Sequence, residues 1–385
     1  MARIITKKKI NTKEDNEVRI MLLGHEKTAF LHLPTPIERL DNLSEELGIN
    51  LYIKRDDLTP LAMGGNKLRK LEYFLADAKA KGATMLLTVG GAQTNHGRLT
   101  CAVARKYGMK GAIVCVDEYP GELSANLLLD GMMGCDVWLR KEDESGRKSE
   151  GELLKETVEE VTKHYENQGE KVYFIPMGGS NELGILGYYE CAMEIAGQLK
   201  GAGIAFDAMG AFDAEGKSHL PRVITTVGSM GTYMGLFTGI RMERLPLRLT
   251  GVGIMPYEEG IRNYAKKYFD RVCDFYGFDR ENSPAKGVST EDFDITDKYD
   301  RGAYNNPCKE VREAMYLAAE KEALILDPCY TGKCFAGILE MVKNGEISQG
   351  ETVIFLHTGG MPGINTPFHR VEIEKERDKF IHIIG

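Results

Sequence analysis

Several patterns that identify common classes of protein are missing from this 385-residue chain. None of its eight cysteines forms a Cys-x-x-Cys pair or lies near a histidine at a zinc-like spacing, so we expect no metal site. The net charge of -8 comes from interspersed acidic and basic residues, whereas a nucleic-acid partner would need a basic face. No apolar run is long enough to span a membrane, and we expect no signal peptide. These absences favour a cytoplasmic protein with reduced thiols and no membrane partner.

Short apolar segments alternate with amphipathic segments along most of the chain, and this alternation predicts an α/β fold. Strands are expected at 85–89, 111–116, 136–139, 172–176 and 222–226. Helices are expected at 97–107, 126–133, 141–168 and 183–199. Because the strands are apolar on both faces, we expect a largely parallel sheet covered by helices on both sides, with the chemistry at the carboxyl ends of its strands. Two segments, 208–221 and 282–307, break the alternation, and we interpret the first as an inserted surface loop or hairpin.

One lysine stands at an unusual place, between a strand and a helix. The strand-like segment 51–55 is followed by Gly64-Gly65-Asn66, which brings Lys67 to the start of a helical pattern. A lysine presented in this way is suited to form a Schiff base with an aldehyde cofactor. The pattern therefore predicts a pyridoxal phosphate enzyme acting on amino acids. Such an enzyme also needs a phosphate cradle and a partner for the pyridine nitrogen.

A glycine-rich segment follows the strand expected at 222–226 and opens another helix. It contains Val227, Gly228, Ser229, Met230, Gly231 and Thr232. Glycines let successive backbone N–H groups point inward, and the helix N-terminus and two hydroxyl groups add further attraction for an anion. A Walker loop is excluded because no Lys-Ser/Thr pair follows, and Gly-x-Gly-x-x-Gly is absent. The segment predicts a monophosphate cradle, with a structural glycine turn as the alternative.

Two further turns carry candidate residues. In segment 326–333, Tyr330 can present a phenol or stack on a ring, and the Thr331 hydroxyl can hold a pyridine nitrogen. Taken alone, this segment is better explained as an ordinary turn in which Thr331 caps the following helix. His357 ends the last expected strand, and a satisfied core histidine is favoured there over a ligand.

Five motifs occur in an order that resembles one known family. They are Pro34-Thr35-Pro36, the segment 52–58, the segment 64–70, Gln93-Thr94-Asn95-His96 and the segment 228–232. Together they resemble the pyridoxal phosphate-dependent 1-aminocyclopropane-1-carboxylate (ACC) deaminase and D-cysteine desulfhydrase family, to which L-cysteate sulfo-lyases also belong. The resemblance extends from about residue 33 to residue 362. It implies the tryptophan synthase β-like fold of fold-type II enzymes, with two open three-layer αβα domains and mostly parallel sheets.

We expect these two domains to divide the chain unequally. The large domain, which binds pyridoxal 5′-phosphate, is expected from residues 1–68 plus 169–385, and the small α/β domain from residues 69–168. The cofactor should lie in the cleft between them, where closure can exclude water. A homodimer is implied by the resemblance alone.

The resemblance assigns cofactor contacts to matching positions of this chain. Lys67 corresponds to the Schiff-base lysine, which would also move the α-proton, and Lys70 to the residue that reaches the cofactor phosphate. Asn95 corresponds to the residue that hydrogen-bonds the 3′-oxygen of the ring. Thr331 would face the pyridine nitrogen. The phosphate would bind to Val227, Gly228, Ser229, Met230, Gly231 and Thr232.

The same resemblance assigns residues to the substrate. Gln93, Thr94 and His96, together with Asn95, lie in the loop that receives the substrate carboxylate. Tyr330 corresponds to an active-site tyrosine near the lysine, and Tyr304 resembles a second tyrosine that faces the substrate. Lys67, Thr94 and the two tyrosines are the candidate catalytic residues.

Departures from the family pattern bear on the substrate. ACC deaminases carry glutamate where this chain has Thr331, and a neutral residue there suits α,β-elimination better than opening of a cyclopropane. Thr94 replaces the usual serine, and we expect its extra methyl group to narrow the pocket. Arg301 could meet an anionic substrate tail, but a surface charge is favoured there.

The first hypothesis is therefore a lyase that converts D-cysteine to pyruvate, sulfide and ammonia. L-cysteate or another β-substituted alanine is the second choice of substrate, and ACC is the third. A non-catalytic protein that binds pyridoxal phosphate is an alternative of another class. A nucleotide- or sugar-phosphate-binding protein that uses only the glycine loop would leave Lys67 unexplained. The sequence leaves open the stereochemistry of the substrate and its leaving group.

Overall fold

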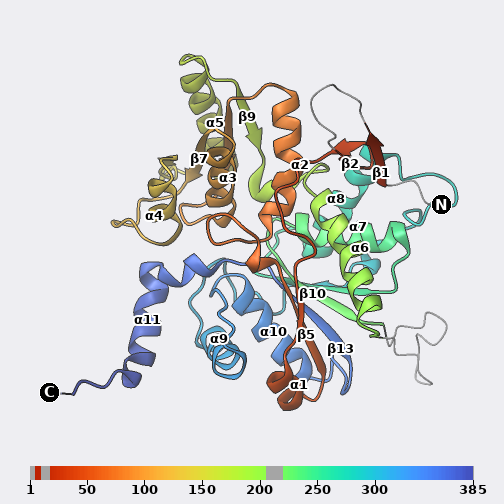
Figure 1. Ribbon diagram of the computed structural model, residues 1–385. Helices are drawn as coiled ribbons and strands as arrows, with labels where there is room; N and C mark the ends of the chain where they lie inside the picture. Colours follow the sequence, from red (N-terminus) through yellow and green to blue (C-terminus); the bar gives the residue numbers. More distant parts are fainter. Residues whose placement is uncertain (1–4, 10–17, 205–219, 385) are drawn as a thin grey trace.

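Two parallel sheets form the framework of the computed structural model, which describes residues 5–9, 18–204 and 220–384 (Figure 1). The larger sheet has six strands, and β4 alone is antiparallel to its neighbour. Their order is β12 (Ile295–Thr296), β11 (Arg248–Gly253), β10 (Arg222–Val227), β13 (Thr352–His357), β5 (Asn50–Arg55) and β4 (Ile37–Arg39).

The smaller sheet has four strands, all parallel. Their order is β8 (Asp136–Arg140), β7 (Lys110–Val116), β6 (Met85–Val89) and β9 (Val172–Ile175). Because β9 pairs with β6, this sheet extends past residue 168 to Ile175. The division into two domains with the stated boundaries stays a prediction. A third, antiparallel sheet joins β1 (Ile5–Lys9), β2 (Val18–Leu22) and β3 (His25–Glu26), and it was not predicted.

Helices cover both faces of both parallel sheets. Apolar residues of α6, α7 and α8 pack on one face of the larger sheet, and residues of α1, α9 and α10 pack on the other. In the smaller sheet, α2 and α3 pack against β6 on one side, and α5 packs on the other. The helices are α1 (Asp41–Leu47), α2 (Lys67–Ala80), α3 (Asn95–Lys106), α4 (Ala125–Met132), α5 (Glu150–Glu166), α6 (Leu186–Gly201), α7 (Gly231–Glu243), α8 (Ile261–Tyr276), α9 (Lys309–Glu322), α10 (Thr331–Lys343) and α11 (Pro367–Arg377). The predicted α/β class with mostly parallel sheets in three-layer arrangements is therefore confirmed.

The expected helix over 141–168 is wrong in its first third. Helix α5 begins only at Glu150, because Ser149 and Glu152 form a capping box that ends the preceding loop. Before it, the Asp143 carboxylate accepts hydrogen bonds from three backbone N–H groups of 145–148 and holds that segment in a turn.

Of the two segments expected to be irregular, the structure describes the second in full and only a small part of the first. Most of the expected insertion at 208–221 lies outside the described residues. The segment 282–307 is mostly irregular, but it contains the edge strand β12 and the short helical turn η4 (Thr290–Asp292).

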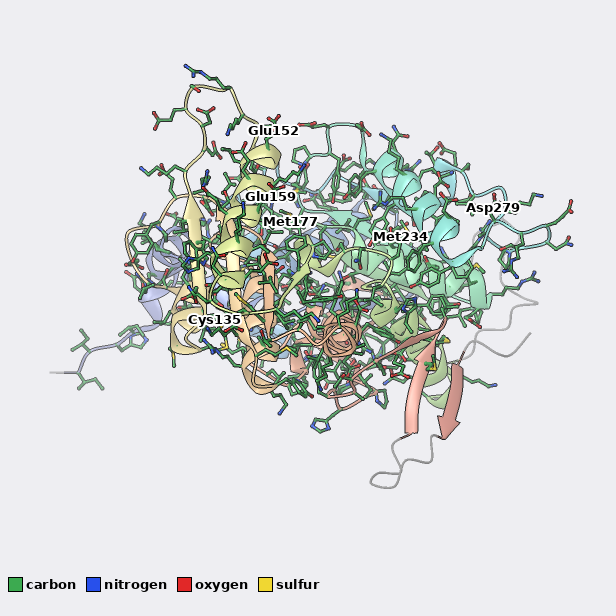
Figure 2. The ribbon with its side chains drawn as sticks, turned by 90° about the horizontal axis from the view of Figure 1, so that it is seen from above. Cys135, Glu152, Glu159, Met177, Met234 and Asp279 are labelled. Atoms are coloured by element: carbon green, nitrogen blue, oxygen red, sulfur yellow. The ribbon has the colours of Figure 1, made fainter. Side chains whose placement is uncertain are left out.

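The segments that follow parallel strands converge where the two sheets meet. Seen from above, Cys135, Glu152, Glu159 and Met177 lie on one side of the molecule, and Met234 and Asp279 on the other (Figure 2). The chain continues from β5 to α2, from β6 to α3 and from β10 to α7, so the three helices begin at the carboxyl ends of strands. The turn η2 (Met177–Gly179) follows β9 in the same way. Side chains at these positions form the candidate site.

Candidate active site

Lys67 is the first residue of α2, and its amine has no acidic partner. Its Nζ lies 3.3 Å from Asn66 Oδ1, and no ion pair to it exists within the described part of the chain. Burial of the amine lowers the pKa of Lys67 to about 8. A substantial fraction of this lysine is therefore neutral near physiological pH, which nucleophilic attack and proton transfer both require.

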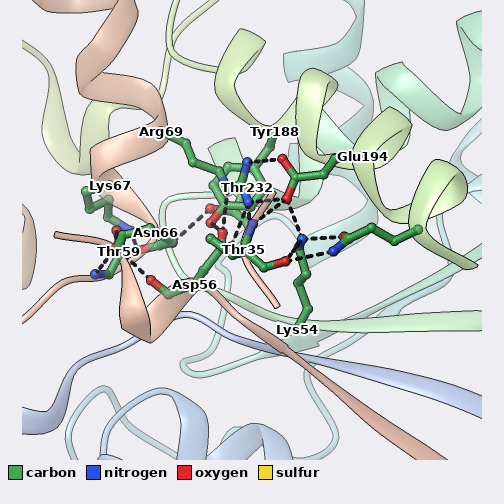
Figure 3. A network of polar contacts seen from close by, with 12 residues as sticks. Thr35, Lys54, Asp56, Thr59, Asn66, Lys67, Arg69, Tyr188, Glu194 and Thr232 are labelled. Atoms are coloured by element: carbon green, nitrogen blue, oxygen red, sulfur yellow. Dashed lines mark hydrogen bonds and ion pairs between the residues drawn. The ribbon is translucent and has the colours of Figure 1, made fainter. Parts of the chain in front are cut away.

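A buried polar network fixes α2 in the fold (Figure 3). Arg69, two residues after Lys67, donates from Nε and Nη2 to the Asp56 carboxylate at 2.8 and 2.9 Å. Its Nη2 also lies 2.9 Å from Glu194 Oε1 on α6, and Tyr188 donates to Asp56 at 2.5 Å. Asp56 comes directly after β5, so the network ties α2 to the larger sheet and to α6. It holds the helix that presents Lys67 in a single position.

The glycine loop at 228–232 is bordered by hydroxyl and amine donors. It follows β10, and α7 begins inside it at Gly231. Ser229 Oγ lies 2.8 Å from Ser180 Oγ, and Asn66 Nδ2 donates to Thr232 Oγ1 at 2.9 Å. The structure thereby brings together the two motifs that carry Lys67 and the predicted cradle.

Lys70 and Gly231 test whether this loop fits the phosphate of pyridoxal phosphate. Lys70 Nζ is buried, and within the described residues its hydrogen bonds go to the Gly178 carbonyl oxygen at 3.0 Å and to Ser180 Oγ at 3.3 Å. Its burial, and then the charge of Lys67, lower the pKa of Lys70 well below the usual value. A side chain at Gly231 would place Cβ 2.8 Å from Lys70 Nζ. Buried amines without a carboxylate, beside a helix N-terminus where only glycine fits, suit a bound phosphate dianion.

In the 93–96 segment, some side-chain amide groups are already hydrogen-bonded within the protein and others are free to bind a ligand. The amide of Gln93 is used internally, because it accepts from Asn126 N at 2.9 Å and donates to Ser124 O at 3.2 Å. Asn95 Oδ1 accepts from Asn126 Nδ2 at 3.0 Å, whereas its own Nδ2 makes no hydrogen bond within the described residues. Asn95 therefore offers a free donor, and Gln93 does not.

His96 is buried, and neither ring nitrogen makes a hydrogen bond of good geometry within the part of the chain that the structure describes. Burial, followed by the charges of Lys67 and Lys70, lowers the pKa of His96 well below its usual range. A Cβ at Gly179 would lie 3.4 Å from the His96 ring and 3.5 Å from the Lys70 side chain. The neutral imidazole thus lies beside Lys70 and can bind a polar ligand group there.

The expectation that the methyl group of Thr94 narrows the pocket is wrong. That methyl group packs inside the fold, between Gly90 and Gly97. A Cβ added at Gly90 would lie 3.0 Å from it, and a Cβ added at Gly97 would lie closer still. The hydroxyl group caps α3 by accepting from Gly97 N at 3.3 Å. Because the helix cap orients the side chain, threonine and serine leave the same space at this position.

Tyr304 and Tyr330 form a pair, joined by a hydrogen bond between their hydroxyl groups. A Cβ at Gly228 would lie 3.6 Å from the Tyr330 ring, so the pair borders the phosphate loop. Burial of both hydroxyl groups raises the pKa of each phenol, although the Tyr304 side chain as a whole stays 44% exposed. Lys333 holds the loop before Tyr304, because its buried Nζ donates to the carbonyl oxygens of Asp300 at 2.7 Å and Ala303 at 2.5 Å. Because the pKa of each phenol is raised, Tyr304 and Tyr330 are both protonated and neutral.

Thr331 is fully buried at the start of α10, and its hydroxyl group donates to Asp327 Oδ1 at 2.6 Å. The same carboxylate accepts from the backbone N–H groups of residues 329, 330 and 331. Asp327, and not Thr331, is therefore the capping acceptor of this turn. His357 is a satisfied core histidine, as favoured, since Nε2 lies 3.2 Å from Ile325 O and Nδ1 accepts from Gly359 N. Arg301 is paired with Glu340.

Several residues that border the site were not singled out from the sequence. They are Asn66, Arg98, Asn126, Ser180, Asp327 and Lys333. Asn66 and Ser180 stand beside glycine pairs at strand ends, which is a pattern that could have indicated them. Arg98, Asn126 and Lys333 act through contacts between distant segments, and Asp327 acts within its own turn.

No metal centre or membrane helix marks a second site in the described residues. Within 5–9, 18–204 and 220–384, no three or more His, Cys, Asp or Glu side chains are grouped so that they could hold a metal ion. Over the same ranges, every helix is too short or too polar to cross a membrane.

Comparison with known proteins places the chain in a family. Residues 29–359 match the model of a family described as pyridoxal-phosphate dependent enzyme. The chain belongs to this family. Its cofactor is pyridoxal 5′-phosphate, in agreement with the cradle around Lys70 and Gly231.

Individual relatives show to which group of the pyridoxal phosphate-dependent family the chain belongs. A Pyrococcus abyssi protein is 35% identical over 86% of this chain and 90% of its own length, and its name assigns it provisionally as a 1-aminocyclopropane-1-carboxylate deaminase. A Yersinia pseudotuberculosis protein named D-cysteine desulfhydrase is 34% identical over 89% of this chain and 98% of its own. The crystal structure of an ACC deaminase homologue matches with a TM-score of 0.74 at 31% identity, over 93% of this chain and 97% of that one. The chain therefore belongs to the ACC deaminase and D-cysteine desulfhydrase group and has the fold of fold-type II enzymes.

Proposed function

We propose that this protein is a lyase that carries out α,β-elimination on a β-substituted amino acid, with D-cysteine as the first candidate. The products would be pyruvate, sulfide and ammonia, with water consumed. The observation that carries the proposal is that a group able to accept a proton and two groups that stay protonated lie around the same loop. Lys67 can accept a proton, whereas Tyr304 and Tyr330 hold theirs. An elimination needs both, because it removes a proton from Cα and delivers one to the departing sulfur.

When bound, pyridoxal phosphate withdraws electrons from the α-carbon of an attached amino acid and so acidifies its Cα–H bond. In our proposal, Lys67 Nζ is the base that takes this proton, because burial leaves much of the amine neutral near pH 8. The Tyr304–Tyr330 pair serves as the proton donor to the leaving group, since both phenols resist ionisation. In this proposal Lys67, rather than a tyrosine, removes the α-proton.

The cofactor would be held by the groups already described. Lys70, Ser180 and the loop 228–232 surround the place of the phosphate, and the free Nδ2 of Asn95 would donate to the ring oxygen. Thr331 would reach the pyridine nitrogen only by releasing Asp327. His96 and Thr94 would bind the substrate carboxylate together with Asn95, whereas Gln93 would support Asn126 from behind.

D-cysteine is preferred over ACC because position 331 is neutral. A carboxylic acid there would keep the pyridine nitrogen protonated and favour opening of a cyclopropane, and threonine offers no such proton. The name of the Yersinia pseudotuberculosis relative agrees with this choice, and that of the Pyrococcus abyssi relative favours ACC. L-cysteate or another β-substituted alanine is the second candidate. A non-catalytic protein that binds pyridoxal phosphate would leave the proton-accepting Lys67 without a role.

We further propose a cytoplasmic homodimer whose subunits have a large domain from 1–68 plus 169–385 and a small domain from 69–168. Size-exclusion chromatography with light scattering would measure the assembly. A monomer at micromolar concentration would contradict the dimer.

A panel of substrates decides the function. Purified holoenzyme would be given D-cysteine, L-cysteine, L-cysteate, D-serine and ACC, with pyruvate and α-ketobutyrate measured in parallel. We expect pyruvate and sulfide from D-cysteine and little α-ketobutyrate from ACC. Rapid formation of α-ketobutyrate from ACC would overturn the argument from Thr331. Cofactor absorbance without product from any substrate would favour the non-catalytic alternative.

A further inference from the structure

The segment that presents Lys67 has an unusual backbone. Five consecutive residues have positive φ, namely Leu61 (74°), Ala62 (43°), Met63 (67°), Gly64 (65°) and Gly65 (132°). Glycine adopts such angles freely, but the three other residues are strained by contacts of their Cβ atoms. A strained segment persists only where its surroundings hold it. The contacts that hold this one therefore determine where α2 begins.

Thr59 bonds Gly65, and the Thr358 carbonyl oxygen accepts from Asn66 N, but the contacts to the carbonyl oxygens of Ala62 and Gly64 come from Arg98 on α3. Its guanidinium group donates through Nη1 to the carbonyl oxygen of Ala62 and through Nη2 to that of Gly64 at 3.3 Å. The side chain is completely buried, although within 18–204 and 220–384 no carboxylate lies at ion-pair distance from it. An arginine without a partner carboxylate is costly to bury, so its carbonyl contacts must be strong.

The same guanidinium group reaches Asn95. Its Nη2 lies 3.5 Å from Asn95 Oδ1, and its Nε donates at 2.8 Å to Asn126 Oδ1. Asn126 Nδ2 in turn donates to Asn95 Oδ1 at 3.0 Å. With its oxygen facing these donors, the Asn95 amide turns its N–H groups away from Arg98. The positive charge behind the oxygen also polarises the amide and strengthens its N–H donors.

We propose that Arg98 is a positioning residue that couples the Lys67 segment to the Asn95 amide, and that its charge acts through that amide on the cofactor. This inference rests on the proposed role of Asn95 as the donor to the ring oxygen. Through the amide, Arg98 favours the negative charge on that oxygen. It thereby favours loss of the proton from the linkage between Lys67 and the cofactor.

Other charged groups face this arrangement. Asp130 on α4 faces Arg98, and burial raises the pKa of this carboxyl group to about 7. Lys70 and His96 face Lys67. Because Lys70 and His96 are present in every variant compared, they change the absolute midpoint rather than the difference caused by Arg98. The charge of Arg98 lowers the pKa of Asp130, so the shift in Arg98→Gln includes the accompanying change in the ionisation of Asp130.

The test compares holoenzymes with Arg98→Lys, Arg98→Gln and, as a matched control, Arg105→Gln, which removes an exposed arginine from the same helix. The visible absorbance of the bound cofactor is titrated with pH. We expect Arg98→Gln to raise the midpoint by about half to one pH unit, and Arg98→Lys and Arg105→Gln to stay near the wild type. An unchanged midpoint in Arg98→Gln overturns the electrostatic part of the proposal.

A second measurement tests positioning without using activity. Hydrogen exchange is followed in the cofactor-free proteins over the peptide that spans residues 61–66. Both Arg98 variants should exchange faster there than the Arg105 control, because neither donates to both carbonyl groups in the arginine geometry. Equal exchange rates overturn the positioning part.

Asn126→Ala keeps the test decisive if Arg98→Gln does not fold. It removes the 3.0 Å contact to Asn95 and the acceptor of Arg98 Nε, but it leaves the Arg98 contacts to the carbonyl oxygens of Ala62 and Gly64. Asn126→Ala should raise the absorbance midpoint by less than Arg98→Gln does, and its hydrogen exchange at 61–66 should stay as in the wild type. A midpoint equal to that of the wild type would contradict the coupling through Asn95. If the wild type itself shows no cofactor absorbance, the proposed function fails. If the wild type shows it and the variants titrate alike, only this inference fails.

Discussion

The hydroxyl group of Thr331 takes part in two hydrogen bonds with Asp327. The hydroxyl group of Thr331 donates to Asp327 Oδ1 at 2.6 Å, and the backbone N–H of Asp327 donates back to Thr331 Oγ1 at 2.9 Å. Both residues are buried, so the pair is closed to water. The residue that distinguishes elimination from ring opening in our proposal is thus also a structural part of the turn that begins α10. Any contact from its hydroxyl proton to the cofactor competes with Asp327.

Replacement of the Thr331 hydroxyl should therefore destabilise the protein. Thr331→Val leaves the buried backbone N–H of Asp327 without an acceptor and removes one of the two donors to its Oδ1, which should cost about 1–3 kcal/mol of unfolding free energy. Thr331→Ser keeps the hydroxyl group and should cost less than about 1.5 kcal/mol. Urea denaturation of the cofactor-free proteins measures both values. Equal stability of the two variants would show that the bonds to Asp327 contribute little.

Gly231 should be essential for cofactor affinity. In Gly231→Ala the new methyl group would lie 2.8 Å from Lys70 Nζ, in the place proposed for the phosphate. We expect the dissociation constant for pyridoxal phosphate to rise at least tenfold, which corresponds to about 1.4 kcal/mol. Fluorescence titration of the cofactor-free protein measures this change. Gly197→Ala is the control, because Gly197 lies on an exposed face of α6 with open space around it, and its affinity should match the wild type.

Lys67 should react as a neutral amine at unusually low pH. Its pKa of about 8 lies below the ordinary value of 10.5 because of burial. In the cofactor-free protein, acylation of Lys67, followed by mass spectrometry of its peptide, should reach half of its maximal rate near pH 8. A midpoint near the ordinary value of 10.5 would contradict the burial argument.

The lowered pKa of Lys67 also predicts how stability depends on pH. Between pH 8 and 10.5 the unfolded chain holds the Lys67 proton more tightly than the folded protein does, so this residue makes stability rise with pH in that window. Lys67→Met should remove that contribution from the difference between the two proteins. Unfolding free energies of both cofactor-free proteins at pH 7.5 and 9.5 would test this sign.

The network around Arg69 should make the fold sensitive to acid. Burial alone would raise the pKa of Asp56, but Arg69 and then Lys54 keep it below the usual value. A carboxyl group with a depressed pKa stabilises the fold at pH values above its unfolded pKa, near 4, and loses that effect as the pH falls through its folded pKa. Asp56→Asn should therefore cost about 3–5 kcal/mol at pH 7 and much less near pH 3. The measurement is urea denaturation at both pH values, and an equal loss at each would contradict the ionic origin.

Local patterns predicted the elements that carry the chemistry. The apolar segments at 85–89 and 222–226 became β6 and β10, because short runs that are apolar on both faces are stable only between layers of helices. The glycines before Lys67 and within 228–232 indicated the ends of strands, where parallel sheets place their ligands. The family and its cofactor followed from these motifs, and both are confirmed.

Other features depended on local capping contacts, which the sequence pattern did not reveal. The side chain of Thr94 was misjudged because a helix cap decides its orientation, and the start of α5 was misplaced because a capping box decides it. Asp327 replaced Thr331 as the capping acceptor for the same kind of reason, a carboxylate that reaches three N–H groups at once. Capping contacts are specific to one geometry, and periodicity of apolar residues does not reveal them.

By itself, the sequence predicted most of the strands and helices, a candidate lysine for the cofactor and a loop suited to its phosphate, because each depends on residues adjacent in the chain. Tertiary structure decided which side chains are free to act. It assigned the amide of Gln93 to Asn126, left the N–H groups of Asn95 free, and placed Arg98 between that amide and the Lys67 segment. These assignments depend on hydrogen bonds between residues about 30 positions apart, and only the packed fold brings such residues within bonding distance.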